Sequence, residues 1–251
     1  MAIIWQKQKN NTKYEIRSAG ATRRLYKNGV CHSQFNSNRV LTGSVWDLLF
    51  IPGLLFDRDT PLKVLVLGVG GGAVIRLFDH FFQDCEIHGV ELDSLHIDLA
   101  KRFFGIEKDN VLIQEADAKQ WVDTYEGGPF DIVIEDVFIE EKKQPLRALD
   151  ANSDWYRSLL KLMQPKGMLI MNFAGLREFR HSSALRVKSI NHEFKSVFQL
   201  TTPTLDNVIG VYSRKTLQTD ELHQALLDTD EVRKAIESKY LRYRVRKLRQ
   251  L

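Results

Sequence analysis

The sequence predicts an α/β protein built on a doubly wound, Rossmann-like sheet of seven strands, with an antiparallel last pair and a small N-terminal β-unit in front. Apolar runs alternate with amphipathic segments beyond residue 62, which is typical of a parallel sheet covered by helices on both faces. The connector 203–207 between the last two strand-like runs is too short for a helical crossover, so these strands should be antiparallel. Short β-rich segments around the tight-turn pair Asn28-Gly29 predict the N-terminal unit.

The N-terminal β-unit is assigned to residues 1–42 and is expected to contain three short strands. These strands lie at 13–18, 22–26 and 30–35. A helix is expected over 42–56, and Pro52 and Gly53 must kink or end it.

The α/β domain is assigned to residues 43–215. Its strands are expected at 62–67, 86–90, 111–114, 131–135, 168–173, 195–201 and 208–212. Its helices are expected near 73–82, 93–104, 118–124, 154–162 and 183–192. The remaining residues, 216–251, are expected to form an amphipathic helix over 221–240 followed by a basic tail.

Composition limits the class of protein. The chain has 251 residues, of which 43% are hydrophobic and 27% charged, values that exclude collagen-like and wholly disordered proteins. No stretch approaches the roughly 20 apolar residues of a membrane span, and no secretory signal is visible, so we expect a cytoplasmic protein without a membrane partner. Cys31 and Cys85 form no ligand pair and are interpreted as free thiols.

The net charge of +4 is located mainly near the C-terminus. Residues 239–249 contain six cationic side chains and no acidic one, so the rest of the chain carries a net charge of −2. With that charge, the rest of the chain is not expected to bind nucleic acid. We interpret the basic tail as a solvated helix end, and nucleic-acid contact is the alternative.

A glycine-rich turn follows the first strand of the predicted sheet. The segment 64–73 reads VLVLGVGGGA, so a buried strand ends in Gly68, Gly70, Gly71 and Gly72 and leads directly into a helix. Glycines let the backbone approach a ligand closely, and the helix N-terminus offers free N–H groups. The turn therefore predicts a nucleotide or nucleoside site.

Two acids that follow the next two strands are candidates for the same site. Glu91 lies 23 residues beyond Gly68, the spacing at which an acid accepts hydrogen bonds from ribose hydroxyls. The alternative is that Glu91 caps the helix that opens at Asp93. Asp117 follows the third strand and either contacts an adenine amino group or only caps the next helix.

The fourth strand ends at Glu135-Asp136, on the edge where open α/β sheets bind ligands. Adjacent carboxylates on a strand point to opposite faces, so one of them at most enters the crevice, and we choose Asp136 as the catalytic candidate. The following segment, 137–152, is either a solvated loop or an active-site lid. The histidines show no metal-ligand spacing and no GxSxG or Walker lysine motif occurs, so no metal, hydrolase or P-loop site is expected.

Together these features resemble the class I S-adenosylmethionine-dependent methyltransferase fold and, within it, the spermidine-synthase-like family. The likeness lies in VLVLGVGGGAVIRLF, IHGVELD and FDIVIED, in Asp117, in the turn 162–167 and in the antiparallel last pair, and it covers roughly residues 13–215. It implies S-adenosylmethionine, or its decarboxylated form, as cofactor. Gly68 to Gly72 would approach the methionine part, Glu91 the ribose and Asp117 the adenine, while Asp136 falls on the catalytic aspartate of the aminopropyltransferases.

Three departures from those aminopropyltransferases bear on the reaction. Gly71 stands where they carry an aspartate, Ile139 stands where they carry a second acid, and their acidic, tyrosine-bearing motif is missing from 35–47. A polyamine is a polycation that needs several carboxylates in a dry pocket. We therefore expect methyl transfer from the full cofactor to a small-molecule acceptor, an amine being one candidate, with Asp136 orienting or deprotonating it. Glu135 or Glu140 could serve as a second acid.

Three alternatives stay open. The first is an aminopropyltransferase that uses decarboxylated S-adenosylmethionine. The second is a non-catalytic cofactor-binding or interaction protein that has lost its acceptor site. The third is an NAD-dependent oxidoreductase, because Gly68, Gly70 and Ala73 with Glu91 also satisfy the dinucleotide fingerprint. The resemblance also implies a homodimer.

Overall fold

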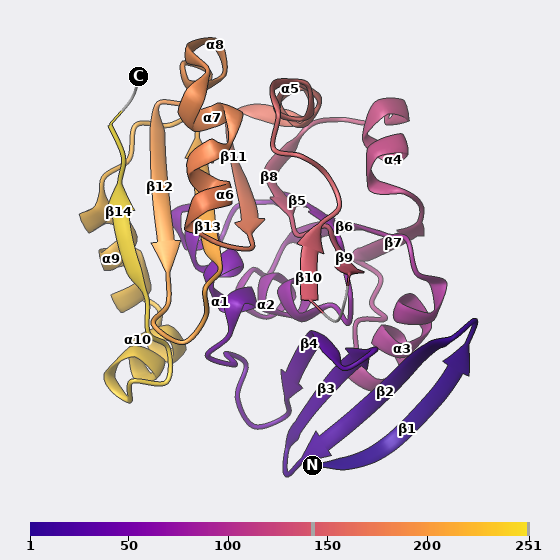
Figure 1. The fold of residues 1–251 in the computed structure, drawn as a ribbon. Coiled ribbons are helices and arrows are strands. Elements are labelled where there is room, and N and C mark those ends of the chain that lie inside the picture. The colour runs from indigo at the N-terminus through magenta and orange to yellow at the C-terminus, as the bar shows by residue number, and fades with distance from the viewer. Residues whose placement is uncertain (142–143, 250–251) are drawn as a thin grey trace.

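The computed structural model describes residues 1–141 and 144–249, and its first element is an antiparallel N-terminal sheet in the order β1-β2-β3-β4 (Figure 1). Its strands are β1 (Ala2–Lys9), β2 (Thr12–Ala19), β3 (Thr22–Lys27) and β4 (Val30–Asn36). Asn28 and Gly29 adopt φ of 48° and 87° between β3 and β4, which confirms the predicted tight turn. β1 is an additional strand beyond the three expected, and it pairs with β2 along its length.

The main sheet has eight strands in the order β14-β12-β13-β11-β8-β5-β6-β7. Its strands are β5 (Leu62–Leu67), β6 (Cys85–Glu91), β7 (Val111–Glu115), β8 (Phe130–Glu135), β11 (Met163–Phe173), β12 (Ser196–Thr201), β13 (Val208–Ser213) and β14 (Arg244–Lys247). The five neighbouring strands β11, β8, β5, β6 and β7 run parallel, and β13 is antiparallel to both β11 and β12. The doubly wound sheet with its antiparallel pair is therefore confirmed.

The expected number of seven strands is wrong, because part of the expected basic tail is the strand β14. Arg244 to Lys247 pair antiparallel with β12 at the edge of the sheet. Val245 packs against the hydrophobic core, whereas Arg244 and Arg246 are exposed. The alternation of inward and outward side chains is what a half-buried strand requires.

Helices cover both faces of the main sheet. One face carries α1 (Val45–Phe50), the 3-10 helix η1 (Ile51–Leu55), α2 (Ala73–Phe81), α9 (Thr219–Leu227) and α10 (Asp230–Glu237). The other carries α4 (Ala118–Thr124), α5 (Ser153–Lys161), α6 (Leu176–His181), α7 (Ser183–Arg186) and α8 (Lys188–Asn191). The helices expected over 183–192 and 221–240 are thus each two shorter helices. Among the described residues, no helix is both long and apolar enough to cross a membrane.

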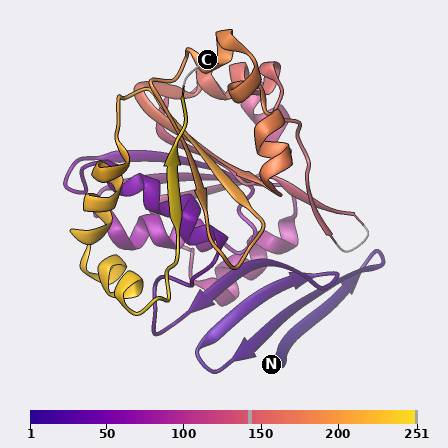
Figure 2. The same cartoon turned by 60° about the vertical axis from the view of Figure 1, so that its left-hand side comes forward.

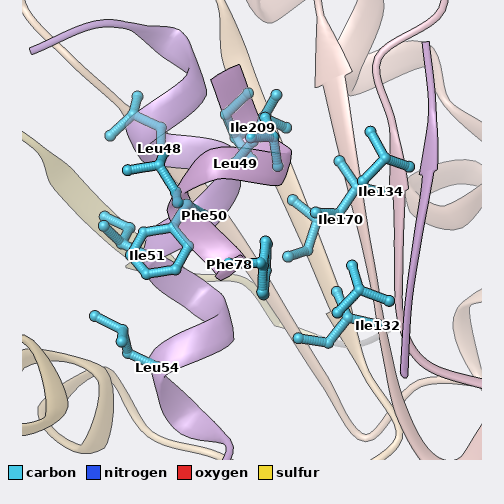
Figure 3. Packing of buried hydrophobic residues seen from close by; sticks show 14 of the residues in the cluster. Leu48, Leu49, Phe50, Ile51, Leu54, Phe78, Ile132, Ile134, Ile170 and Ile209 are labelled. Atoms are coloured by element: carbon cyan, nitrogen blue, oxygen red, sulfur yellow. The ribbon is translucent and has the colours of Figure 1, made fainter. Parts of the chain in front are cut away.

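The larger core packs α1 and α2 against the strands. Phe50 and Phe78 meet edge to face with ring centroids 5.1 Å apart, and Figure 3 shows Phe78 facing Ile132 and Ile170 of the sheet. The remaining helix, α3 (Ser94–Phe104), carries Leu95, Leu99 and Phe104, which are buried against Tyr14, Ile16 and Leu25 of the N-terminal sheet. This second contact holds the N-terminal sheet against the carboxyl edge of the main sheet, as both views show (Figures 1 and 2).

The segment 137–152 begins with a β-hairpin rather than with an irregular loop. β9 (Phe138–Glu141) and β10 (Gln144–Arg147) pair antiparallel, with Ile139 opposite Leu146 and Phe138 opposite Arg147. Figure 2 shows the hairpin extending from the carboxyl edge toward the N-terminal sheet. The hairpin therefore lies directly beside the predicted site.

Candidate active site

The glycine turn lies between β5 and α2 and is enclosed by other parts of the chain. Gly68 has φ of +84°, and a Cβ placed on it would stand 2.2 Å from the carbonyl oxygen of Asp136. A Cβ on Gly71 would stand 2.6 Å from the Cβ of Ser33 in β4. Gly72 is the N-cap residue of α2, and Gly70 donates its N–H to Glu91. The turn is thus fitted closely to β4 on one side and to the end of β8 on the other.

Glu91 ends β6, and its carboxylate binds main-chain N–H groups on both sides. Its Oε2 accepts from Gly70 N at 2.7 Å and its Oε1 from Asp93 N at 2.9 Å. Burial alone would raise the pKa of Glu91, but the imidazole of His96 and these two N–H groups outweigh burial and lower the pKa. Glu91 is therefore an ionised carboxylate at the glycine turn, and Asp93, not Glu91, is the N-cap of α3.

Side chains of the N-terminal sheet contact Asp93, two residues beyond Glu91, and no sequence motif pointed to them. Tyr14 donates to Asp93 Oδ2 at 2.7 Å, and Lys27 binds the same oxygen at 2.8 Å. Burial raises the pKa of Asp93, yet these two partners lower it overall to about 2. His32 in β4 lies 3.0 Å from Glu140 Oε1 in β9, which joins the N-terminal sheet to the hairpin.

Asp117 follows β7 at the same edge and is the N-cap of α4. Its Oδ1 accepts from Gln120 N at 2.9 Å, so the capping interpretation of this residue is confirmed. Among the described residues, no hydrogen bond joins Asp117 to the other candidate site residues. Its predicted contact with adenine stays a prediction.

Asp136 follows β8 and is bound by neutral donors rather than by a cation. Asn172 in β11 donates to Asp136 Oδ1 at 2.7 Å, and a hydrogen bond from Trp46 also helps to hold the charged form. Burial outweighs these bonds and the more distant charge of Arg147, and it raises the pKa of Asp136 to about 6. A carboxyl group with that pKa can accept or release a proton near neutral pH.

Glu135 points away from Asp136 and forms a buried ion pair. Arg147 in β10 donates to Glu135 Oε2 at 2.6 Å, and the two side chains are 2% and 0% exposed. Arg147 also donates to the carbonyl oxygens of Asn172 and Leu149 and lies 3.1 Å from Glu178. The base of the hairpin is therefore fastened to β8, β11 and α6. Because Arg147 already binds Glu135, the geometry does not support the expectation that Glu135 serves as a second acid.

The strand order places the candidates side by side along the carboxyl edge. Asp136 follows β8, Gly68 follows β5, Glu91 ends β6 and Asp117 follows β7, and these four strands are neighbours. The glycine turn thus has Glu91 on one side and Asp136 on the other. Among the described residues, no cluster of three or more metal-ligating side chains occurs.

The fold is the Rossmann-like methyltransferase fold, with a mixed central sheet and a small antiparallel N-terminal sheet. Residues 51–221 match the model of the spermine/spermidine synthase domain. The chain therefore belongs to the spermine/spermidine synthase domain family, and the predicted family resemblance is confirmed.

Curated relatives are transferases of two kinds. The chain is 29% identical over 125 residues to a polyamine aminopropyltransferase of Chromobacterium violaceum, covering 48% of this chain and 46% of that protein. It is 30% identical over 137 residues to the bovine eEF1A lysine and N-terminal methyltransferase, covering 50% of this chain and 19% of that protein. The matched part is thus at most about half the length of these relatives.

Solved structures share the fold. A probable spermidine synthase from Corynebacterium glutamicum superposes with a TM-score of 0.70 at 18% identity over 96% of both chains. Human methyltransferase-like protein 13, solved with SAH, superposes with a TM-score of 0.61 at 17% identity over 77% of this chain and 92% of that one. The fold itself is therefore found in proteins named for aminopropyl transfer and for methyl transfer alike.

Proposed function

We propose that this protein is an S-adenosylmethionine-dependent methyltransferase whose acceptor presents a single amine. The turn Gly68, Gly70, Gly71 and Gly72 would hold the methionine part of the cofactor, Glu91 the ribose and Asp117 the adenine. Asp136 would act on the acceptor. Family membership supports a transferase that binds this class of cofactor, and the site geometry supports the choice of methyl transfer.

Polar atoms beside the glycine turn fit a ligand of this kind. Ser33 Oγ and His96 Nε2 are buried and have no hydrogen-bond partner among the described residues. Ser33 lies against Gly71, and His96 Nδ1 lies 3.7 Å from Glu91 Oε1. Each oxygen of Glu91 can accept a second hydrogen bond in addition to the N–H that it already binds. A ligand with hydroxyl and amino groups would give these atoms the partners that they lack.

The observation that carries the proposal is the distribution of charge around the site. Arg147 pairs with Glu135, whereas His96 and His32, which carry a charge only when protonated, lie against Glu91 and Glu140. Among the described residues, Asp136 has no cation within ion-pair distance. Asp136 is thus the carboxylate without a side-chain partner that can carry a positive charge, and it matches one ammonium group, whereas a polyamine needs several. The site is therefore suited to an acceptor with a single positive charge.

The packing of Gly71 favours the full cofactor over the decarboxylated form. An aspartate at this position, as in the resembling aminopropyltransferases, would place its Cβ 2.6 Å from the Cβ of Ser33. β4 thus occupies the space that an acidic side chain would need. Without that acid, no negative charge repels the carboxylate of the full cofactor. Aminopropyl transfer is the second candidate, because relatives such as the Chromobacterium violaceum protein are named for it.

In the proposed reaction, Asp136 accepts the proton that the acceptor ammonium loses, so that a neutral nitrogen attacks. Bound S-adenosylmethionine would supply a methyl group activated by a positive sulfur, so that the carbon–sulfur bond would break as the carbon–nitrogen bond formed. The chain's own contribution would be to position the reactants: the glycine turn would orient the methyl donor beside β4 and the β9–β10 hairpin. Asp136 then releases the proton to solvent.

The test is transfer of labelled methyl groups from S-adenosylmethionine to a panel of putrescine, a lysine-containing peptide and a peptide with a free N-terminus. Asp136→Asn is expected to lower turnover by about 100-fold or more while the affinity for the cofactor stays within about twofold. Asp123→Asn, the same change on the exposed face of α4, is the control and should leave turnover unchanged. Loss of turnover in Glu140→Gln but not in Asp136→Asn would assign the proton acceptor to Glu140 and contradict the proposal.

A further inference from the structure

Three polar side chains form a continuous relay along the carboxyl edge of the sheet, from β13 to β8. Asn207 precedes β13, Asn172 lies in β11, and Asp136 follows β8. Asn207 Nδ2 donates to Asn172 Oδ1 at 3.0 Å, and Asn172 Nδ2 donates to Asp136 Oδ1 at 2.7 Å. Among the described residues, Asn207 has no hydrogen bond to Asp136 itself, so it acts on Asp136 through Asn172.

The chemistry of the groups fixes the direction of these hydrogen bonds. An ionised carboxylate only accepts, so Asn172 must turn its NH₂ group toward Asp136. The amide oxygen of Asn172 then faces Asn207, which must donate to it. Asn207 therefore stabilises the orientation in which the NH₂ group of Asn172 lies against Asp136.

Asn172 is a polar side chain within a buried, otherwise apolar stretch of β11. The segment from Gly167 to Phe173 is buried, and Asn172 itself is 3% exposed. A buried amide is costly unless its polar atoms are bonded. Both side-chain groups of Asn172 are bonded within the relay, and Arg147 donates to its carbonyl oxygen at 2.5 Å. Side chain and main chain of Asn172 are thus both held in place.

We infer that Asn172 and Asn207 are positioning residues that orient the Asp136 carboxylate and keep it ionised for proton transfer. This inference rests on the proposed function in one respect, the role of Asp136 as proton acceptor. Asn172 acts by direct contact with Asp136, and Asn207 acts through Asn172. Neither residue belongs to a motif that the sequence displays.

Other charged groups act on Asp136 from the elements packed around it. Arg147 in β10 stabilises the charged form, whereas Glu91 in β6 and the neighbouring Glu135 in β8 oppose it. Trp46 in α1 adds a hydrogen bond. The substitutions that test the relay leave all four groups in place, so they isolate the effect of the two asparagines.

The experiment measures the pKa of Asp136 by NMR titration of protein labelled with ¹³C at aspartate carboxyl groups, without any acceptor. The Asp136 signal is assigned by its loss in Asp136→Asn. Asn172→Leu removes the donor with little change of shape and should raise the pKa of Asp136 by about one pH unit. Asn207→Leu, which removes no direct contact, should raise it by roughly half a unit.

Two further variants make the result decisive. Asn207→Asp also abolishes the donor, but it adds a charge; a shift in this variant without a shift in Asn207→Leu would overturn the relay in favour of simple charge repulsion. Asn110→Leu removes an asparagine donor that binds Cys85 O, outside the relay, and should leave the pKa of Asp136 unchanged. Should Asn172→Leu fail to fold, the half-exposed Asn207 still decides the question.

Activity separates this inference from the proposed function. Once the panel identifies an acceptor, the acidic limb of the kcat profile should move upward in Asn207→Leu by the same amount as the Asp136 pKa, with the Kd for S-adenosylmethionine unchanged. If wild type binds the cofactor and turns over while Asn207→Leu shifts neither quantity, the relay is wrong and the function stands. If wild type neither binds nor turns over, the function is wrong, and the pKa titration still judges the relay.

Discussion

Replacing Arg147 by methionine tests the buried ion pair that fastens the hairpin to the sheet. The substitution leaves the fully buried Glu135 carboxylate without its cation and removes the donors to Asn172 O and Leu149 O. Breaking a buried pair by removing one partner costs about 3–5 kcal/mol. At roughly 2–4 °C per kcal/mol for a chain of this size, the Tm should fall by roughly 6–20 °C.

The cost should also depend on pH, and the sign follows from Glu135. Burial raises the pKa of Glu135 to about 7, above its ordinary value near 4.5, although Arg147 opposes the shift. The pKa of Glu135 is higher in the folded protein than in the unfolded chain, so the protonated form of Glu135 favours folding. Its contribution to the free energy of unfolding is complete below about pH 4.5 and is lost as the pH rises through 7. In the variant the pKa of Glu135 should rise further, because the cation that lowers it is gone. The variant should therefore be most destabilised at pH 8 and less so at pH 5, where Glu135 is neutral.

Urea unfolding at pH 5 and pH 8 measures both effects. Lys119→Met is the matched control, because it breaks an exposed ion pair with Asp123 and should cost at most about 1 kcal/mol at either pH. An Arg147→Met variant that lost no more stability than the control would refute the importance of the buried pair. A loss of equal size at both pH values would refute the assignment of the charge to Glu135.

Three further predictions concern the glycine turn, the edge strand and the end of β7. Gly68→Ala should lower the Tm measured by thermal melting more than Gly20→Ala does. Both glycines have positive φ, but only at Gly68 would the added Cβ meet the backbone, 2.2 Å from the carbonyl oxygen of Asp136. Removal of residues 244–251 should expose the edge of β12 and increase aggregation measured by light scattering, and unchanged solubility would contradict this. Asp117→Ala and Asn152→Ala should each cost about 1 kcal/mol as lost helix caps, but only Asp117→Ala should weaken cofactor binding in calorimetry.

The sequence was sufficient to predict the features of the site that depend on neighbouring residues. The glycine turn after β5, the acid at the end of β6 and the two acids at and after the end of β8 are each local continuations of a strand. Their meeting at one edge follows from parallel strand order, which the alternation of apolar runs predicts. The capping role of Asp117 was one of two open interpretations, because a single acid before a helix fits both.

The features that the sequence could not predict depend on contacts between distant segments. Tyr14, Lys27 and His32 join the site because α3 packs on the N-terminal sheet, a contact that no local pattern encodes. Arg147 is one of many arginines until β10 places it against Glu135. The relay through Asn172 and Asn207 likewise requires β11 and β13 to be neighbours.

The strand β14 shows how charge can conceal a pattern. Six cations within residues 239–249 suggest a solvated segment, although Val245 between Arg244 and Arg246 provides the alternation of a strand. A single inward-facing valine is a weak signal beside so many charges. Pairing with β12, which is distant in sequence, determines the outcome.

Parallel calorimetric titration with S-adenosylmethionine and its decarboxylated form tests the central claim most directly. The claim is that Gly71 and the single free carboxylate of Asp136 adapt this family member to methyl transfer. We predict that the full cofactor binds at least about tenfold more tightly than the decarboxylated form. Tighter binding of the decarboxylated form would contradict the claim and assign aminopropyl transfer to this site, and binding of neither would contradict the cofactor assignment itself.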